Sequence, residues 1–113
     1  MDFDQNKPIY LQIFDSICEQ ILSGAIAPEE RILSVREYGA SVGVNPNTVA
    51  RSYEKLTDAG IIYNKRGIGY YVAAPAKDII LAAERQRFMN EEVPAFLKRL
   101  DLLGIDPKDI FNK

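Results

Sequence analysis

Histidine is absent from this sequence, and cysteine occurs once, as Cys18. The common zinc sites and the Ser-His or Cys-His nucleophile arrangements therefore cannot be built from the chain. The adjacent carboxylates Glu29–Glu30 and Glu91–Glu92 point in different directions on a helix, which suits solvated faces better than acid–base pairs. We expect no catalytic activity, no metal and no cofactor, and a buried thiol at Cys18.

Long apolar runs are also missing. No segment approaches the ~18 residues that a membrane span needs, and residues 1–6 lack the basic and apolar regions of a signal peptide. The 113 residues are 47% apolar and 27% charged, which is the composition of one small globular domain, with or without an appendage. We expect a folded cytoplasmic protein that has no membrane partner.

The first half of the chain carries signals for helices. Between Pro8 and Leu22 apolar residues recur at steps of three and four, which is typical of an amphipathic helix, and Gly24 is placed to end it. Ser34 and Glu37 match a capping box, so a short second helix is predicted to start there. Gly43 supplies the left-handed conformation that a tight stop requires.

A third helix is predicted from Pro46 to about Ala59. Asn45 is suited to cap it, proline is tolerated at the first helical position, and Gly60 ends it. The second and third helices are joined by a short turn that contains glycine, which is the spacing of a helix-turn-helix.

The third helix has two different faces. Its inward face carries Val49, Tyr53 and Leu56, and its outward face is predicted to carry Asn47, Thr48, Arg51, Ser52 and Lys55. Asparagine can pair with adenine, the methyl group of Thr48 can contact a thymine methyl, and Arg51 can reach guanine or a phosphate. This face suits the DNA major groove, although an ordinary solvated helix has a similar pattern.

A β-hairpin is predicted after the third helix. The β-prone runs Ile61–Tyr63 and Tyr70–Val72 flank a segment, Asn64–Gly69, with two basic residues and two glycines at the tip. A hairpin in this place is a wing, whose glycines let the backbone approach DNA while Lys65 and Arg66 supply counter-charge. A plain solvent-exposed hairpin is the alternative.

Together these motifs resemble the winged-helix DNA-binding domain of the GntR family of bacterial transcription regulators. The resemblance covers Lys7 to Val72, about three fifths of the chain, and its pieces are Pro8-Ile9-Tyr10 with Gln12-Ile13, Ser34-Val35-Arg36-Glu37, Val44-Asn45-Pro46-Asn47-Thr48-Val49, Tyr53 with Leu56, Gly60-Ile61-Ile62 and Gly67-Ile68-Gly69. The opening Pro-Ile-Tyr, the Asn-Pro-Asn-Thr-Val run and the short tail resemble the YtrA-like branch.

The resemblance implies positions for DNA contact. Arg36 would bind the backbone or a nearby base, Asn47, Thr48 and Arg51 would face the major groove, and Gly67 with its neighbours would form the wing contact. The complete predicted contact set is Ser34, Arg36, Asn45, Asn47, Thr48, Arg51, Lys65, Arg66, Gly67 and Gly69.

The sequence departs from the family pattern in two places. Where the family has Gly and then Leu-Pro ahead of the capping box, Glu30 and Ile32-Leu33 occupy those places. Tyr38-Gly39 replaces the usual Leu-Ala pair, and a glycine inside so short a helix should weaken it by ~1 kcal/mol. Neither change removes a predicted contact.

Charge limits the expected affinity. Residues 1–74 hold seven Lys/Arg against nine Asp/Glu, and residues 75–113 hold seven of each. Binding must therefore depend on a local cluster, Arg36, Arg51, Lys55, Lys65 and Arg66. We expect weak non-specific binding, strong salt dependence, and useful affinity only for a dimer on a two-part site.

The tail, residues 75–113, carries an apolar stripe. Asp78 is suited to cap a helix, and Asp106-Pro107 can start a short last helix after Gly104. At Pro94 we expect either a kink or a second helix that begins near Asn90 with the proline in its first turn. We expect the stripe to form a homodimer interface through Ile80, Phe88, Met89, Val93, Phe96, Leu97, Leu100 and Leu103. Packing of the stripe against the chain's own winged domain is the alternative. An unknown small-molecule effector, if one exists, would bind at the dimer interface or between tail and wing, because the tail is too short for its own pocket.

The predicted fold class is mainly α with a small β-hairpin: a winged helix-turn-helix at residues 1–74, followed by a short α-helical dimerisation tail at residues 75–113. The predicted function is a sequence-specific DNA-binding transcription regulator, a repressor, that acts as a homodimer on a two-fold symmetric operator. The alternative is a winged-helix module for protein contact that does not bind DNA.

Overall fold

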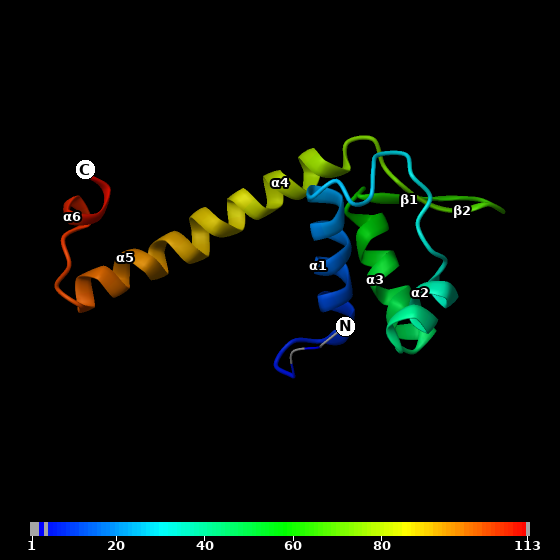
Figure 1. Cartoon of the computed structure of the whole chain (residues 1–113), viewed down its shortest axis with the longest axis horizontal. Coiled ribbons are helices and arrows are strands. Elements are labelled where there is room, and N and C mark those ends of the chain that lie inside the picture. Colours follow the sequence, from blue (N-terminus) through cyan, green and yellow to red (C-terminus); the bar gives the residue numbers. More distant parts are fainter. Residues whose placement is uncertain (1–2, 4, 113) are drawn as a thin grey trace. The chain divides into compact units, whose positions relative to one another are not determined.

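The computed structural model describes residues 3 and 5–112 of the chain. Its elements are α1 (Ile9–Leu22), α2 (Val35–Val42), α3 (Pro46–Asp58), β1 (Ile62–Lys65), β2 (Gly69–Val72), α4 (Ala76–Arg87), the π-helical segment η1 (Phe88–Glu92), α5 (Val93–Leu102) and α6 (Pro107–Phe111) (Figure 1). This confirms the predicted class, mainly α with a small hairpin. By contacts, one compact unit ends at Ile80 and a second begins at Leu81.

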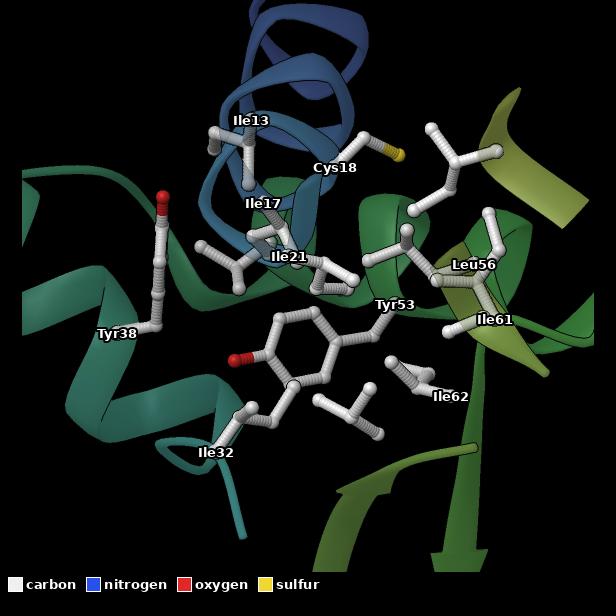
Figure 2. Close-up of a cluster of buried hydrophobic side chains, with 14 residues drawn as sticks. Ile13, Ile17, Cys18, Ile21, Ile32, Tyr38, Tyr53, Leu56, Ile61 and Ile62 are labelled. Atoms are coloured by element: carbon white, nitrogen blue, oxygen red, sulfur yellow. The ribbon is translucent and has the colours of Figure 1, made fainter. Parts of the chain in front are cut away.

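The core of the first unit surrounds Tyr53 of α3. The residue is 1% exposed, and its ring makes edge contacts with Tyr38 of α2 and Tyr70 of β2, at centroid distances of 6.2 and 5.0 Å. Figure 2 shows the ring between Ile21 of α1 and Ile32 of the segment before α2. The hydroxyl donates to the carbonyl oxygen of Leu33 at 2.6 Å, so the polar end of this buried residue is satisfied.

The turn between α2 and α3 is unusually close to α2. Gly43 ends α2 with φ +71°, as predicted, and the N–H of Val44 donates to the carbonyl of Gly39 at 2.9 Å. A Cβ at Gly39 would lie 2.6 Å from the carbonyl oxygen of Val44. The glycine that lowers the helix propensity of α2 therefore also permits this close approach.

A third strand-like segment, which the sequence did not predict, lies beside the hairpin. Arg31 forms an antiparallel bridge with Tyr71 of β2, and the N–H of Ile32 donates to the carbonyl of Tyr70 at 2.9 Å. The bridge ties the loop before α2 to the wing. One side of β2 is thus covered by β1 and the other by residues 29–32.

This segment begins at a turn with an unusual backbone. The N–H of Glu30 donates to the carbonyl of Ala27 at 3.1 Å, and Glu29 inside the turn has φ +65°, the only positive φ of a non-glycine residue within residues 3 and 5–112. Glycine is the residue that best fits such a position. Glu29, and not its neighbour Glu30, therefore holds the position at which a glycine would suit this backbone.

The division between the units lies after Ile80 because two residues of α4 belong to the first core. Ala76 is fully buried and Ile80 is 3% exposed. We predicted that Asp78 caps this helix. The helix begins at Ala76, so Asp78 lies within its first turn and is not the cap. Its carboxylate still suits the positive end of the helix.

In the second unit the chain passes Pro94 without leaving helical conformation. The N–H of Val93 donates to the carbonyl of Phe88, which is the five-residue step of a π-helix. Pro94 then occupies the first turn of α5, where its missing N–H needs no partner. A π turn therefore precedes Pro94, and the proline lies in the first turn of a further helix, as one of the two predicted alternatives had it. Asp106 caps α6 by accepting from the N–H of Lys108 at 2.9 Å, as predicted.

The structure also describes the environment of Cys18 and the length and polarity of the helices. Cys18 is 7% exposed, which confirms the buried thiol. Across the described part of the chain, no helix combines the length and the apolar character needed to cross a membrane.

Candidate nucleic-acid interface

Helix α3 has one buried and one exposed face. Val49 and Leu56 are fully buried on the side that packs against α1 and α2. Asn47 and Arg51 are exposed, and Thr48 is half-buried. The structure therefore leaves the three predicted base-reading side chains outside the core.

The start of α3 is organised by its cap. The Asn45 side-chain oxygen accepts from the N–H of Asn47 at 2.8 Å, and Pro46 occupies the first helical position, as predicted. Asn45 itself is exposed. The cap uses one of the two lone pairs of this oxygen, so the second lone pair and the amide N–H₂ are left for other contacts.

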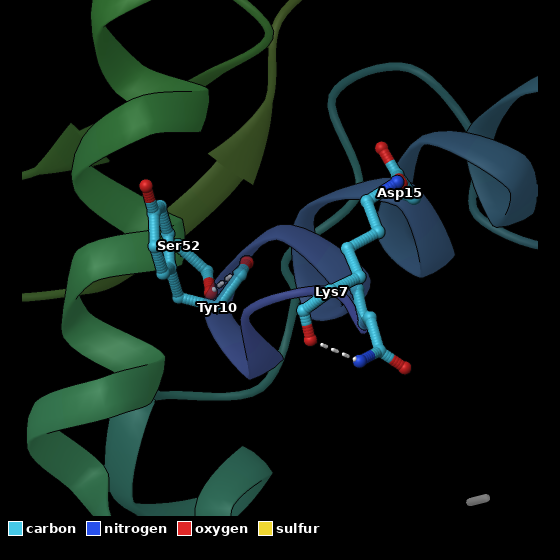
Figure 3. Close-up of polar contacts among 5 residues, drawn as sticks. Lys7, Tyr10, Asp15 and Ser52 are labelled. Atoms are coloured by element: carbon cyan, nitrogen blue, oxygen red, sulfur yellow. Dashed lines mark hydrogen bonds and ion pairs between the residues drawn. The ribbon is translucent and has the colours of Figure 1, made fainter. Parts of the chain in front are cut away.

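Ser52 corrects the predicted outward face. It is fully buried, and its hydroxyl donates to the carbonyl oxygen of Tyr10 in α1 at 2.7 Å (Figure 3). The sequence pattern missed this because the position faces α1, and a serine in such a contact can satisfy its hydroxyl on the neighbouring backbone. Ser52 links the two helices and is removed from the DNA-reading face.

Two aromatic residues of α1 support the cations of α3. The guanidinium carbon of Arg51 lies 4.0 Å from the centre of the Tyr10 ring, and the Lys55 ammonium lies 5.0 Å from the centre of the Phe14 ring. Such cation–π contacts are worth ~0.5–1 kcal/mol at exposed sites. In the sequence, Phe14 is one of the apolar residues that recur between Pro8 and Leu22. Their spacing predicts a helix but does not show which cation an aromatic ring will contact.

Just before α1, Lys7 forms an ion pair with Asp15 of that helix (Figure 3). The side-chain amide of Gln12 donates to the carbonyl oxygen of Lys7 at 2.7 Å. Both contacts fix the chain at the start of α1, close to Tyr10 in sequence.

The start of α2 is the second part of the interface. The Ser34 hydroxyl accepts from the N–H of Glu37 at 3.1 Å, and the Glu37 carboxylate accepts from the N–H of Ser34 at 3.0 Å, which confirms the capping box. These hydrogen bonds, and the nearby charge of Arg31, hold the pKa of Glu37 below its usual value. Arg36 is exposed beside this cap.

The strands of the wing are longer and its tip is shorter than predicted. The β1–β2 ladder pairs Ile62 with Val72 and continues to Lys65 with Gly69. The tip is therefore Arg66 to Ile68, closed by the Ile68 N–H donating to the Lys65 carbonyl at 2.9 Å. Lys65 and Gly69 lie at the end of the ladder because the pairing continues beyond the β-prone residues.

The side chains at the wing differ in exposure and support. Arg66 and Gly67 are exposed at the tip, and Gly67 has φ +79°. Ile68 is 53% exposed there, an apolar residue that sequence analysis left without a role. The Lys65 ammonium lies 5.3 Å from the centre of the Tyr71 ring. The wing thus presents two cations and one apolar side chain.

Arg31 lies next to the wing, a position that no pattern in the sequence predicts. The residue is exposed, and the bridge to Tyr71 places it beside β2. Only the tertiary pairing of residues 29–32 with β2 brings it there. Single-sequence patterns do not encode such pairing.

The second unit has an apolar groove of about 540 Å³ lined by Phe88, Glu92, Val93, Phe96, Leu97 and Phe111. The rings of Phe96 and Phe111 contact each other edge to face, with their centres 6.2 Å apart. Two of the residues predicted for a dimer interface are covered by the chain itself: Ile80 in the first core and Leu100, 5% exposed, in the second unit. The other six are exposed or half-exposed.

The described residues contain no group of three or more His, Cys, Asp or Glu side chains placed to hold a metal ion. The predicted contact residues lie on a polar helix face, a capped helix start and a basic hairpin.

Comparison with known proteins places the chain in context. Residues 9–72 match the family described as bacterial regulatory proteins, gntR family. The HTH-type transcriptional repressor YtrA of Bacillus subtilis (strain 168) is 37% identical over 106 residues, which cover 94% of this chain and 81% of that protein.

Solved structures agree with this match. A GntR-family protein from Bacteroides thetaiotaomicron is 51% identical, with a TM-score of 0.78 over 90% of this chain and 88% of that chain. The DNA-binding domain of AraR, in complex with operator ORR3, is 27% identical, with a TM-score of 0.58 over 65% of this chain and 88% of that chain. The likeness extends from the winged helix-turn-helix into the tail for the first of these proteins.

Proposed function

Because the chain belongs to the gntR family of bacterial regulatory proteins, we propose that it regulates transcription by binding operator DNA as a homodimer. YtrA is a repressor and AraR binds an operator, and we propose repression at an operator for this chain. The protein acts by binding, without a catalytic step, in the cytoplasm where the bacterial chromosome lies.

One observation carries the proposal: α3 exposes Asn47 and Arg51, with Thr48 half-buried beside them, while its opposite face is locked into the core. An amide, a short hydroxyl and a guanidinium at consecutive turns provide the donors and acceptors that major-groove base edges require. The buried face keeps the helix from rotating, so these side chains are presented in one orientation. They read the base sequence.

The start of α2 and the wing supply backbone contacts. Ser34 and Arg36 lie at the N-terminus of α2, where the helix dipole favours a phosphate. Lys65, Arg66 and Gly67 approach the same duplex from the hairpin, with Gly67 allowing close backbone approach. Residues 1–74 hold fewer basic than acidic residues. The few cations at the interface therefore give weak binding per copy, and the affinity for DNA falls as the salt concentration rises.

A second copy of the chain supplies the remaining affinity. In residues 81–112, Leu100 is the only buried large apolar side chain, whereas Phe88, Met89, Phe96, Leu97 and Leu103 are 45–62% exposed. So short a helical segment cannot bury an adequate core alone. Two-fold pairing covers these residues together with half-buried Val93, and brings two copies of α3 to one operator.

Sedimentation equilibrium of Phe96→Asp and Ala95→Asp tests the pairing. Both variants place a carboxylate on adjacent exposed residues of α5, but only Phe96 lines the apolar groove. We expect Phe96→Asp to be monomeric at micromolar concentration, and Ala95→Asp to stay dimeric like the natural protein. A natural protein that sediments only as a monomer contradicts the dimer.

A binding titration tests the function itself. Fluorescence anisotropy with the DNA upstream of the protein's own gene should show binding that weakens steeply between 50 and 200 mM salt. Salt-independent binding contradicts the phosphate contacts. The near-neutral charge of the chain favours one alternative, a winged-helix module for protein contact, and a complete absence of DNA binding would support it.

A further inference from the structure

Arg31 and Gly69 lie against each other on the outer face of the wing. Arg31 pairs with Tyr71, and paired residues of antiparallel strands project to the same face. Gly69 is two residues from Tyr71 in β2, so it shares that face. The core side of the same sheet is occupied by Ile62 and Val72, both nearly inaccessible. Arg31 therefore stands on the side of the wing that faces away from the core.

Gly69 provides the space that the guanidinium occupies. A Cβ at Gly69 would lie 2.9 Å from Nε of Arg31, 3.4 Å from Nη2 and 3.6 Å from Cζ. Gly69 also has φ +144°, a conformation that favours glycine. Any other residue would push the Arg31 side chain from this position. Because Gly69 has no side chain, the Arg31 guanidinium from a different segment can lie against the end of the ladder.

Lys65 approaches the same glycine from the other neighbouring strand. It is the ladder partner of Gly69, so both project to one face, and its ammonium lies over the Tyr71 ring. Two exposed cations consequently flank β2, one from β1 and one from residues 29–32. Within residues 3 and 5–112, neither of them forms an ion pair with a carboxylate at 4.0 Å or less. Like charges that share one face repel each other, and the Glu29 carboxylate of the segment 29–32 accepts from the Tyr63 hydroxyl at 2.6 Å and pairs with neither cation.

Arg31 also lies near the start of α2. Its charge contributes, after the hydrogen bonds with Ser34, to the lowered pKa of Glu37. That carboxylate is fixed at the α2 cap, beside Arg36. Arg31 therefore stands between the capped helix start and the wing, the two parts of the interface that contact phosphates in the proposed function.

We propose that Arg31, seated on Gly69, binds a phosphate of the operator backbone together with Lys65. The inference rests on the proposed DNA binding and adds a contact to it. The planar guanidinium can hold two phosphate oxygens at once, which the Lys65 ammonium complements as a point charge. The contact makes the backbone footprint continuous from α2 to the wing, and it adds no preference for base sequence.

The salt dependence of binding tests this contact. Each phosphate contact contributes about 0.9 to the slope of log K against log salt. Arg31→Gln should lower the magnitude of the slope by about two, one contact from each subunit, and should weaken binding to all sequences alike. Arg85→Gln removes the same charge from an exposed position in α4 and should leave the slope as it is.

Three further variants separate a contact from a structural effect. Arg31→Lys should keep most of the slope, and Arg31→Met, which keeps an apolar stem to pack on Gly69, should lose it. Gly69→Ala keeps the charge but displaces the guanidinium, so it should also lower the slope. Thermal unfolding shows whether each variant is folded. If Arg31→Gln does not fold, the comparison of Arg31→Lys with Arg31→Met still tests the contact.

Two failures are distinguishable. If the natural protein binds operator DNA and Arg31→Gln and Arg31→Met retain its slope, the Arg31 contact is wrong and the proposed function stands. If the natural protein does not bind DNA, the proposed function is wrong, and this contact is wrong with it.

Discussion

The guanidinium of Arg51 lies on the ring of Tyr10, 4.0 Å from the ring centre, while the next residue along α3, Ser52, donates to the Tyr10 carbonyl. One residue of α1 therefore contacts two consecutive residues of α3. The carbonyl contact fixes where α3 lies, and the ring contact limits the rotamers available to Arg51. Arg51 is thus partly ordered in the free chain, which would lower the entropy cost of the DNA contact that we propose for it.

Replacing Tyr10 by leucine should weaken operator binding about two- to fivefold per subunit, which corresponds to the ~0.5–1 kcal/mol of an exposed cation–π contact. Tyr10→Phe keeps the ring and should bind like the natural protein. Anisotropy titrations measure both, with thermal unfolding to check the fold. Tighter binding by Tyr10→Leu would mean that Arg51 must leave the ring to reach DNA.

Arg51 and Arg66 should differ in kind. Arg51→Ala should cost about 1–3 kcal/mol on the preferred site and relax the choice of base at one position in each half-site. Arg66→Ala should weaken all sequences by a similar factor because it removes a phosphate contact. Competition titrations with single-base operator variants measure the difference. Equal losses on every sequence for Arg51→Ala would contradict base reading.

Glu29 should carry a backbone cost that a hydrogen bond offsets. Its φ of +65° disfavours a side chain, but its carboxylate accepts from the Tyr63 hydroxyl at 2.6 Å. In a Tyr63→Phe background, where no hydrogen bond can be lost, Glu29→Gly should raise the free energy of unfolding by about 0.5–1 kcal/mol. In the natural background the gain should be smaller. Urea denaturation of the natural protein, the two single variants and the double variant measures the free energy of unfolding in each case. An equal change on Glu29→Gly in both backgrounds would show that the hydrogen bond does not stabilise the fold.

Stability should fall above pH 10. Burial, then the neighbouring Tyr38, Tyr70 and Glu37, raise the pKa of Tyr53 well above its ordinary 10.0. In this pH range the unfolded chain loses the Tyr53 proton while the folded chain keeps it, so stability present below pH 10 is lost as the pH rises. Tyr53→Phe should be about 1 kcal/mol less stable at pH 7, having lost the bond to Leu33, but less sensitive to alkali. A variant as sensitive as the natural protein would argue against this assignment.

Local chemistry explains which features were predictable from the sequence. The capping box of Ser34 and Glu37, the Asn45 cap and the Gly43 stop each involve residues within four positions, so their residue types specify the geometry. The polar positions Asn47 and Arg51 follow from the helix period once the core face is identified.

Other features depend on contacts between distant segments, which the sequence pattern missed. Ser52 is buried because α1 covers it, and Ile80 is buried because α4 begins against the first core. Arg31 reaches the wing through pairing of residues that are about forty positions apart. Hydrophobic periodicity describes one element at a time, so it cannot identify which other segment will cover a given face.

The most direct measurement is selection of bound fragments from random DNA by the natural protein, followed by sequencing. Two outward-facing α3 helices, paired by the second unit, should enrich a two-fold symmetric motif whose half-sites lie about one helical turn, or a multiple of it, apart. Enrichment of an asymmetric motif would contradict the paired arrangement. No enrichment at all would contradict base reading by α3.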